Sequence, residues 1–176
     1  MDLFNFYFPF TVCLFLLASA LYTDIRLRVI LNIITLPVIV GGILFHFYIS
    51  GWSGGALFAF KGALTGGGLL IVLFVLGGMG GGDVKLLSAL GAWLGTGAVI
   101  QVFIYGAAAG AVIAVFLVIF KKKKMTLMRI WNDLVYFSIT GKRVPVSGKE
   151  DGFPYSIPIA AGFIIYVIKD INIFNC

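Results

Sequence analysis

Two aspartates of this chain lie next to apolar segments, where a charge is costly. Asp24 comes two residues after the apolar segment 3–22, and Asp83 comes directly before the apolar segment 84–94. A carboxylate at membrane depth costs about 2.5–3.5 kcal/mol, so its presence there needs an explanation. The other acidic residues lie near the chain ends or in polar stretches, where charge costs little: Asp2, Asp133, Glu150, Asp151 and Asp170.

Asp24 and Asp83 have two interpretations. As a pair, two carboxyl groups a few ångströms apart cannot both ionise, so they share one proton. The ionised group then takes a proton from a water molecule that attacks a peptide carbonyl, and the protonated group gives one to the carbonyl oxygen or the leaving amine. This chemistry requires neither a metal ion nor a cofactor. Alternatively, Asp24 pairs with Arg26 or Arg28, and Asp83 with Lys85, as ion pairs at the ends of spans.

A glycine run before Asp83 favours the first interpretation. The chain reads Gly77-Gly78-Met79-Gly80-Gly81-Gly82 and then Asp83. Glycine permits backbone conformations closed to other residues and lets a second chain, here an extended peptide substrate, approach closely. We expect Asp83 at or before the first turn of the following helix, where it also caps free amide groups. The separate glycine run 66–68 is expected to serve helix packing.

The composition identifies the solvent of this chain as lipid. Of 176 residues, 61% are apolar and 11% are charged, whereas a soluble domain is about half apolar and a quarter charged. The predicted fold class is an all-α integral membrane protein, with residues 1–176 forming one membrane-embedded domain. The net charge of +6 is expected to report orientation in the membrane rather than nucleic-acid binding. The isolated Cys13 and Cys176 indicate neither a metal site nor a disulfide.

Six apolar segments are candidates to cross a bilayer, for which about 20 residues are needed. They are 3–22, 30–49, 55–76, 84–94, 98–120 and 153–168. The fourth is short, but fusing it with the fifth would place Lys85 and the basic run 121–124 on opposite sides, which the positive-inside rule disfavours. The first segment lacks the basic start of a signal peptide. The basic residues that follow it predict an outside N-terminus and place both aspartates at the cytoplasmic face.

The longest polar stretch, 121–152, is expected to be a cytoplasmic loop. Its basic run 121–124 has the composition of a stop-transfer anchor that also meets anionic headgroups. Apolar residues recur at helical spacing over 125–139, which predicts an amphipathic helix on the cytoplasmic surface. His46, in the second span, has no neighbouring ligand in the sequence, and we expect a packed or interfacial histidine rather than a metal site.

Three stretches of the chain resemble motifs of the type IV prepilin peptidases. The eighteen residues 78–95 include the G-x-G-D sequence Gly80–Asp83 and are similar, in register, to the signature of that family. The segment 24–32 is similar to the first-aspartate motif, except that Leu31 replaces the usual proline. The segment 153–160 is similar to the Pro-Tyr segment that opens the last span.

The resemblance, which covers roughly residues 14–168, implies an aspartic endopeptidase of the inner (cytoplasmic) membrane. Its substrates would be prepilins, pilin-like proteins or pseudopilins, whose leader peptides are cut after a glycine on the cytoplasmic side. Asp24 and Asp83 match the catalytic pair of the family, with no metal or cofactor. Other matching positions are expected to shape the site or bind substrate: Gly80, Gly81, Gly82, Lys85, Asn32, Pro154 and Tyr155.

The sequence also departs from the family pattern. Larger members carry an added cytoplasmic segment with paired Cys-x-x-Cys motifs, and they also methylate the new amino terminus. This sequence has no such segment, so we expect peptidase activity without N-methyltransferase activity. The short form most resembles the enzymes that serve tight-adherence (Flp) pili. Leu31 in place of proline leaves the start of the second span less rigid.

Other functions fit parts of the sequence. An archaeal preflagellin peptidase shares the aspartate pair. The presenilin group also uses G-x-G-D, but its Pro-Ala-Leu motif does not occur in this sequence. A small ion- or proton-coupled transporter would bind its ion at Asp24 and Asp83 and would predict an inverted repeat. A non-catalytic assembly partner would tolerate replacement of both aspartates.

Overall fold

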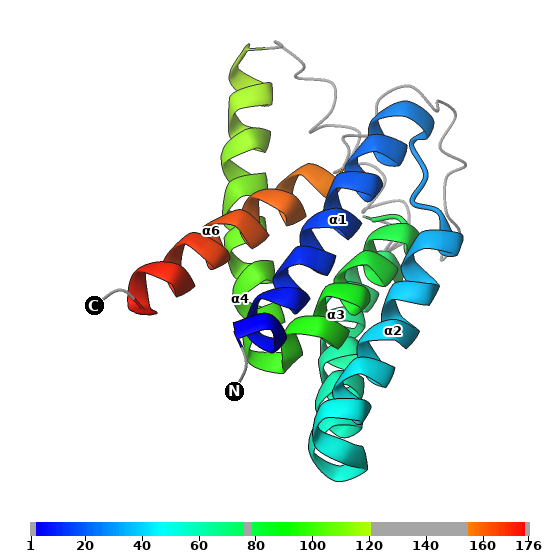
Figure 1. The fold of residues 1–176 in the computed structure, drawn as a ribbon. Coiled ribbons are helices and arrows are strands. Elements are labelled where there is room, and N and C mark those ends of the chain that lie inside the picture. Colours follow the sequence, from blue (N-terminus) through cyan, green and yellow to red (C-terminus); the bar gives the residue numbers. More distant parts are fainter. Residues whose placement is uncertain (1–2, 76–78, 121–154, 175–176) are drawn as a thin grey trace. The chain divides into compact units, whose positions relative to one another are not determined.

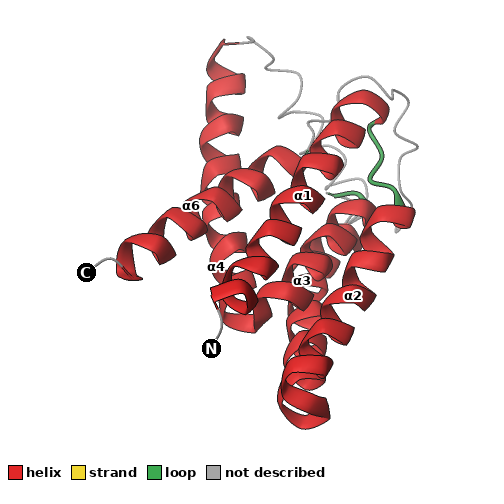
Figure 2. Cartoon of the chain, viewed as in Figure 1, coloured by secondary structure: helices red, strands yellow, loops and turns green. Residues whose placement is uncertain are grey.

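The computed structural model describes residues 3–75, 79–120 and 155–174, and every regular element in these ranges is helical (Figure 2). The elements in chain order are α1 (Leu3–Leu27), α2 (Asn32–Ser50), the wide turn η1 (Gly51–Ala56), α3 (Leu57–Val75), α4 (Gly81–Phe120) and α6 (Ser156–Phe174). The predicted all-α class is confirmed for this part of the chain. The predicted cytoplasmic loop 121–152, with its amphipathic segment 125–139, lies outside the described residues.

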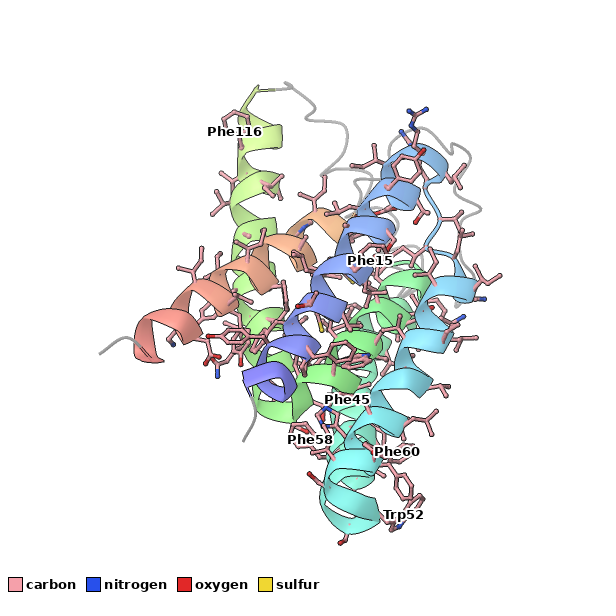
Figure 3. All side chains as sticks on the ribbon, viewed as in Figure 1. Phe15, Phe45, Trp52, Phe58, Phe60 and Phe116 are labelled. Atoms are coloured by element: carbon pink, nitrogen blue, oxygen red, sulfur yellow. The ribbon has the colours of Figure 1, made fainter. Side chains whose placement is uncertain are left out.

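Three helical stretches are long and apolar enough to cross a membrane: Tyr7–Leu27, Asn32–Val75 and Gly81–Phe116. The second has 44 residues and the third has 36. One crossing takes about 20 residues, with a lower limit of about 17, so the second is long enough for two crossings and the third only for two short ones. Large apolar side chains lie on the outside: Phe15, labelled in Figure 3, is 79% exposed. Such a surface suits acyl chains rather than water. The number of crossings and their orientation stay predictions.

Glycines with a positive φ break both of the longer stretches. Gly51 has a φ of 69° at the end of α2, and Gly95 has a φ of 81° inside α4, conformations that glycine adopts at little cost. A Cβ atom on Gly95 would also lie 2.1 Å from the ring of Phe58. The parts of α4 before and after Gly95 are therefore separate helices, and the ribbon changes direction between them (Figure 1). This break lies between the expected spans 84–94 and 98–120.

The first part of α4 contributes most to the described core. It carries three completely buried leucines: Leu86, Leu87 and Leu90. Glycines let α3 approach it closely, because a Cβ on Gly62 would lie 2.0 Å from the carbonyl oxygen of Gly91 and one on Gly66 would lie 2.2 Å from that of Leu87. Small residues at a helix interface permit such an approach. The predicted packing role of the run 66–68 therefore holds at Gly66, whereas Gly68 faces open space.

The chain forms two compact units: Met1–Ala109 with Pro154–Cys176, and Gly110–Phe153. The features described below lie in the first unit. There α6 packs against α4 through glycines, because a Cβ on Gly162 would lie 2.4 Å from the carbonyl oxygen of Val102 and one on Gly106 would lie 3.0 Å from that of Pro158. These backbone contacts fix the first turns of α6.

Candidate active site

Asp24 lies in the last turn of α1. The helix ends at Leu27, and Arg28 takes a left-handed conformation with a φ of 53°. The amide of Arg28 donates a hydrogen bond of 2.9 Å to the carbonyl oxygen of Asp24, as at many helix C-termini. The partly buried side chain of Asp24 therefore stands at the end of an apolar helix, where the sequence places it.

Asp83 lies in the first turn of α4, also where the sequence places it. Its amide donates a hydrogen bond of 3.2 Å to the carbonyl oxygen of Gly80, and the residue is only 7% exposed. The start of α4 lies against the segment that follows Asp24, because a Cβ on Gly82 would lie 2.8 Å from the Cβ of Ile30 and the Lys85 ammonium donates to the Asn32 side chain. The Asp24 and Asp83 carboxyl groups are therefore within electrostatic range of each other. The structure thus brings together two acidic residues that are far apart in the sequence.

The glycines before Asp83 lie mostly against the chain itself. A Cβ atom on Gly82 would lie 2.8 Å from the Cβ of Ile30, and one on Gly81 would lie 3.3 Å from an aromatic ring of α3. One on the exposed Gly80 would lie 3.4 Å from a carboxyl oxygen of Asp83. Gly81 and Gly82 therefore let the start of α4 approach its own neighbours, and Gly80 lies beside the Asp83 carboxyl group.

A hydrogen bond joins the segment that follows Asp24 to the segment that follows Asp83. The ammonium group of Lys85 donates to the side-chain oxygen of Asn32 at 2.7 Å. In the parts of the chain that the structure describes, Lys85 forms no ion pair with Asp83. Neutralisation of Asp83 by Lys85, the alternative interpretation of this aspartate, is thus not observed.

Ser156, the first residue of α6, contacts Asp24, although the sequence motifs do not indicate it as a site residue. Its hydroxyl donates to the Oδ2 atom of Asp24 at 2.5 Å, and its amide donates to the same atom at 3.3 Å. Tyr155, a predicted site residue, directly precedes it and is 37% exposed, while Pro154 lies outside the described residues. A serine two positions before Pro158 is a sequence signal for the first turn of a helix, but it does not reveal the partner.

The remaining residues with ligand chemistry, His46 and Cys13, are packed among apolar neighbours. The Nε2 atom of His46 is 3.1 Å from the carbonyl oxygen of Trp93, and its ring centre is 5.0 Å from that of Phe58 (labelled in Figure 3). The predicted packed histidine is therefore observed. Cys13 is a buried free thiol. Over residues 3–75, 79–120 and 155–174, no group of three His, Cys, Asp or Glu side chains is arranged to hold a metal ion.

Comparison with known proteins connects this geometry to a family. The model of the type IV leader peptidase family matches residues 11–115, which contain Asp24, Asn32, Asp83 and Lys85. No curated protein and no solved structure matches the chain significantly. The matched residues make up more than half of the chain and include the helix ends that carry both aspartates. The chain therefore belongs to the type IV leader peptidase family.

Proposed function

We propose that this protein is a membrane aspartic endopeptidase that removes the leader peptides of type IV prepilins or pilin-like proteins at the cytoplasmic face of the inner membrane. The observation that carries the proposal is the proximity of Asp24, at the end of α1, to Asp83, at the start of α4. Membership of a leader peptidase family supports the peptidase activity. The long apolar helices support a site at a membrane, where a leader peptide meets the hydrophobic segment of its pilin.

In this proposal Asp24 and Asp83 hold one proton between them. The ionised carboxylate takes a proton from water as the water oxygen bonds to the peptide carbonyl carbon, and the protonated carboxyl group gives its proton to the carbonyl oxygen. The C–N bond then breaks, the leaving nitrogen takes a proton, and the pair returns to its starting protonation. The chain's own residues supply all the proton transfers, so the proposed reaction uses no metal or cofactor.

The other predicted site residues have supporting parts in this proposal. Lys85 and Asn32 connect the two aspartate segments through their hydrogen bond. Gly80 lies beside the Asp83 carboxyl group, where we place the scissile peptide, while Gly81 and Gly82 allow the close packing of the start of α4. We place Tyr155, which directly precedes Ser156, at the edge of the site where the leader enters.

Cleavage of a prepilin by the reconstituted protein tests the proposal. The full chain is purified, placed in liposomes and incubated with a prepilin, and leader removal is followed by mass spectrometry. Asp24→Asn and Asp83→Asn should each lower the cleavage rate by about 10²–10⁴-fold, the usual contribution of general acid–base catalysis. Asp170→Asn, in α6, is the matched control and should cleave at the wild-type rate. Retained cleavage in either dyad variant, with folding verified by circular dichroism, would overturn the proposal.

The choice of substrate separates the remaining alternatives. A tight-adherence prepilin, a pseudopilin and a preflagellin are offered separately, and cleavage of the preflagellin alone would favour the archaeal-type activity. Proton flux across the same liposomes without any cleavage would favour a transporter. The mass of the mature product also reports methylation of its amino terminus, which we propose does not occur.

A further inference from the structure

The carboxyl group of Asp24 is held by a residue of another helix. Its Oδ2 atom accepts the hydroxyl of Ser156 at 2.5 Å and the amide of Ser156 at 3.3 Å. Asp24 lies in the last turn of α1, whereas Ser156 is the first residue of α6. Both bonds end on Oδ2, so neither occupies the second carboxyl oxygen, Oδ1. Two donors from a single residue therefore hold one side of this carboxyl group.

Ser156 is itself firmly supported. It is completely buried, and the amide of Ile159 donates to the carbonyl oxygen of Tyr155 at 3.4 Å, which places Ser156 in the first turn of α6. The first amides of a helix have no partner within it, so the amide of Ser156 is available to Asp24. This turn lies against α4, where a Cβ on Gly106 would lie 3.0 Å from the carbonyl oxygen of Pro158. Backbone packing therefore anchors the residue that holds Asp24.

We infer that Ser156 is a positioning residue, which holds the Asp24 carboxyl group in one orientation and leaves its Oδ1 atom to the reacting groups. The inference rests on the proposed function, because it concerns the orientation of one member of the proposed pair. The last torsion of an aspartate side chain has a broad range, so an unsupported carboxyl group can rotate away from the substrate. Proton transfer depends on holding the reacting atoms in place. Loss of the support should therefore slow the reaction of a bound prepilin.

A purely structural role for Ser156 leads to a different expectation. In that case its two bonds only attach α6 to α1. A second attachment joins the same two helices, because the rings of Phe10 in α1 and Tyr166 in α6 stack with their centres 6.4 Å apart. A stacked aromatic pair and a hydrogen bond stabilise a fold by similar amounts. Phe10→Leu therefore matches the loss of the Ser156 hydroxyl as an attachment, at a distance of about 20 Å from Asp24 along the helix.

Single-turnover cleavage separates the two roles. Excess protein in detergent micelles is mixed with a prepilin, and leader removal is followed over time at rising protein concentration. The rate constant at saturation reports the reaction of the bound complex, and it does not depend on the fraction of the protein that is folded. An unfolded fraction only raises the protein concentration that gives half of this rate constant. A structural role therefore changes the half-saturating concentration, whereas a positioning role changes the rate constant at saturation.

Loss of the hydroxyl should lower the rate constant at saturation. Ser156→Ala and Ser156→Gly both remove this donor, and each should lower that rate constant by about tenfold while the half-saturating concentration stays within about twofold of the wild type. Ser156→Thr keeps the hydroxyl and should recover most of the rate. Phe10→Leu should keep the wild-type rate constant. Ser156 is completely buried, so the added methyl group of Ser156→Thr can disturb folding; the two smaller variants then decide the result.

A second measurement tests the contact without any cleavage. Thermal unfolding is compared for the wild type, Asp24→Ala, Ser156→Ala and the double variant. Because the two side chains contact each other, the double variant should lose less stability than the sum of the two single losses. Fully additive losses would overturn the inference, whether or not the protein cleaves a prepilin.

The outcomes distinguish failure of the inference from failure of the proposed function. A wild-type protein that cleaves prepilin, with Ser156→Ala and Ser156→Gly at the same saturating rate constant, would overturn the role of Ser156 and leave the peptidase in place. An equal loss of rate constant in Phe10→Leu would show that attachment of α6, and not orientation of Asp24, is what Ser156 supplies. A wild-type protein that cleaves no leader peptide would overturn the proposed function and the assigned role together, even where the unfolding data show the contact.

Discussion

The ammonium group of Lys85 lies 2.7 Å from the side-chain oxygen of Asn32 and donates a hydrogen bond to it. Asn32 is the first residue of α2, and Lys85 lies in the first turns of α4. The bond therefore connects the beginnings of two helices: α2, which follows Asp24, and α4, whose first turn contains Asp83. A contact of this kind can hold the spacing of the proposed pair while leaving both carboxyl groups free for chemistry.

Removal of this contact should slow cleavage without abolishing it. Lys85→Met keeps the length of the side chain and loses the donor, and it should lower kcat/KM by about 3- to 10-fold, since a partly exposed bond of this kind contributes about 0.5–1.5 kcal/mol. Asn32→Ala should give a similar loss. The double variant should lose little more than either single one, because both changes remove the same contact. Fully additive losses would show that the contact does not act in the reaction.

Gly82→Ala should displace the start of α4. Its Cβ atom would lie 2.8 Å from the Cβ of Ile30, whereas carbon atoms in contact stay about 3.5–4.0 Å apart. Overpacking of this kind costs about 1–3 kcal/mol, and the shift carries Asp83 away from Asp24. We expect a lower midpoint of thermal unfolding and a loss of prepilin cleavage of at least about tenfold, because acid–base chemistry depends on the position of the carboxyl groups.

A glycine of α3 gives the matched control for this change. At Gly68 no heavy atom lies within 4 Å of the position that an alanine methyl group would take. Gly68→Ala should therefore retain cleavage and raise stability by about 0.5–1 kcal/mol, the usual gain in a helix interior. Equal losses in Gly68→Ala and Gly82→Ala would show that the effect is general to glycine replacement and does not arise from the contact with Ile30.

Local sequence patterns were sufficient to place each aspartate at a helix end. The glycine run ends at Asp83, directly before an apolar segment, and the structure begins α4 two residues earlier, at Gly81. Asp24 follows an apolar segment, and the structure ends α1 within the next turn. Both positions follow from the change between apolar and polar residues along the chain, which is a local property. The break at Gly95 was likewise predictable, because it separates two apolar runs.

The contacts between these helix ends were beyond the reach of the sequence. The bond between Ser156 and Asp24 depends on the return of α6 to the end of α1, and the approach of Gly82 to Ile30 depends on how α4 packs on the connection before α2. Neither of these two contacts can be deduced from the periodicity of the sequence or from the residues next to it in the chain. The sequence therefore explains the glycine run as the segment that begins a helix at Asp83. The close packing of Gly82 against Ile30 is seen only in the folded chain.

Gly95→Ala should destabilise the protein through both the backbone and the packing. Gly95 has a φ of 81° and a ψ of 176°, a conformation that costs a non-glycine residue about 1–3 kcal/mol. The ring of Phe58 would also lie only 2.1 Å from the added Cβ. Thermal unfolding in detergent, followed by circular dichroism, should show a lower midpoint. Gly97→Ala, which has no atom within 4 Å, should not. The double variant with Phe58→Ala and Gly95→Ala should recover only the part of the lost thermal stability that comes from the clash with the ring. Full recovery of the unfolding midpoint would contradict a backbone cost.

The predicted orientation places the end of α1 and the connection between α2 and α3 on opposite sides of the membrane. Arg26 and Trp52 are both exposed, near these two positions. In a chain with Cys13→Ala and Cys176→Ala, a membrane-impermeant maleimide should label the Arg26→Cys variant only in inverted vesicles. It should label the Trp52→Cys variant only in intact cells, because positively charged ends of spans stay in the cytoplasm. The reverse pattern would place the aspartate pair outside, and labelling of both variants from one side would show that α2 does not cross.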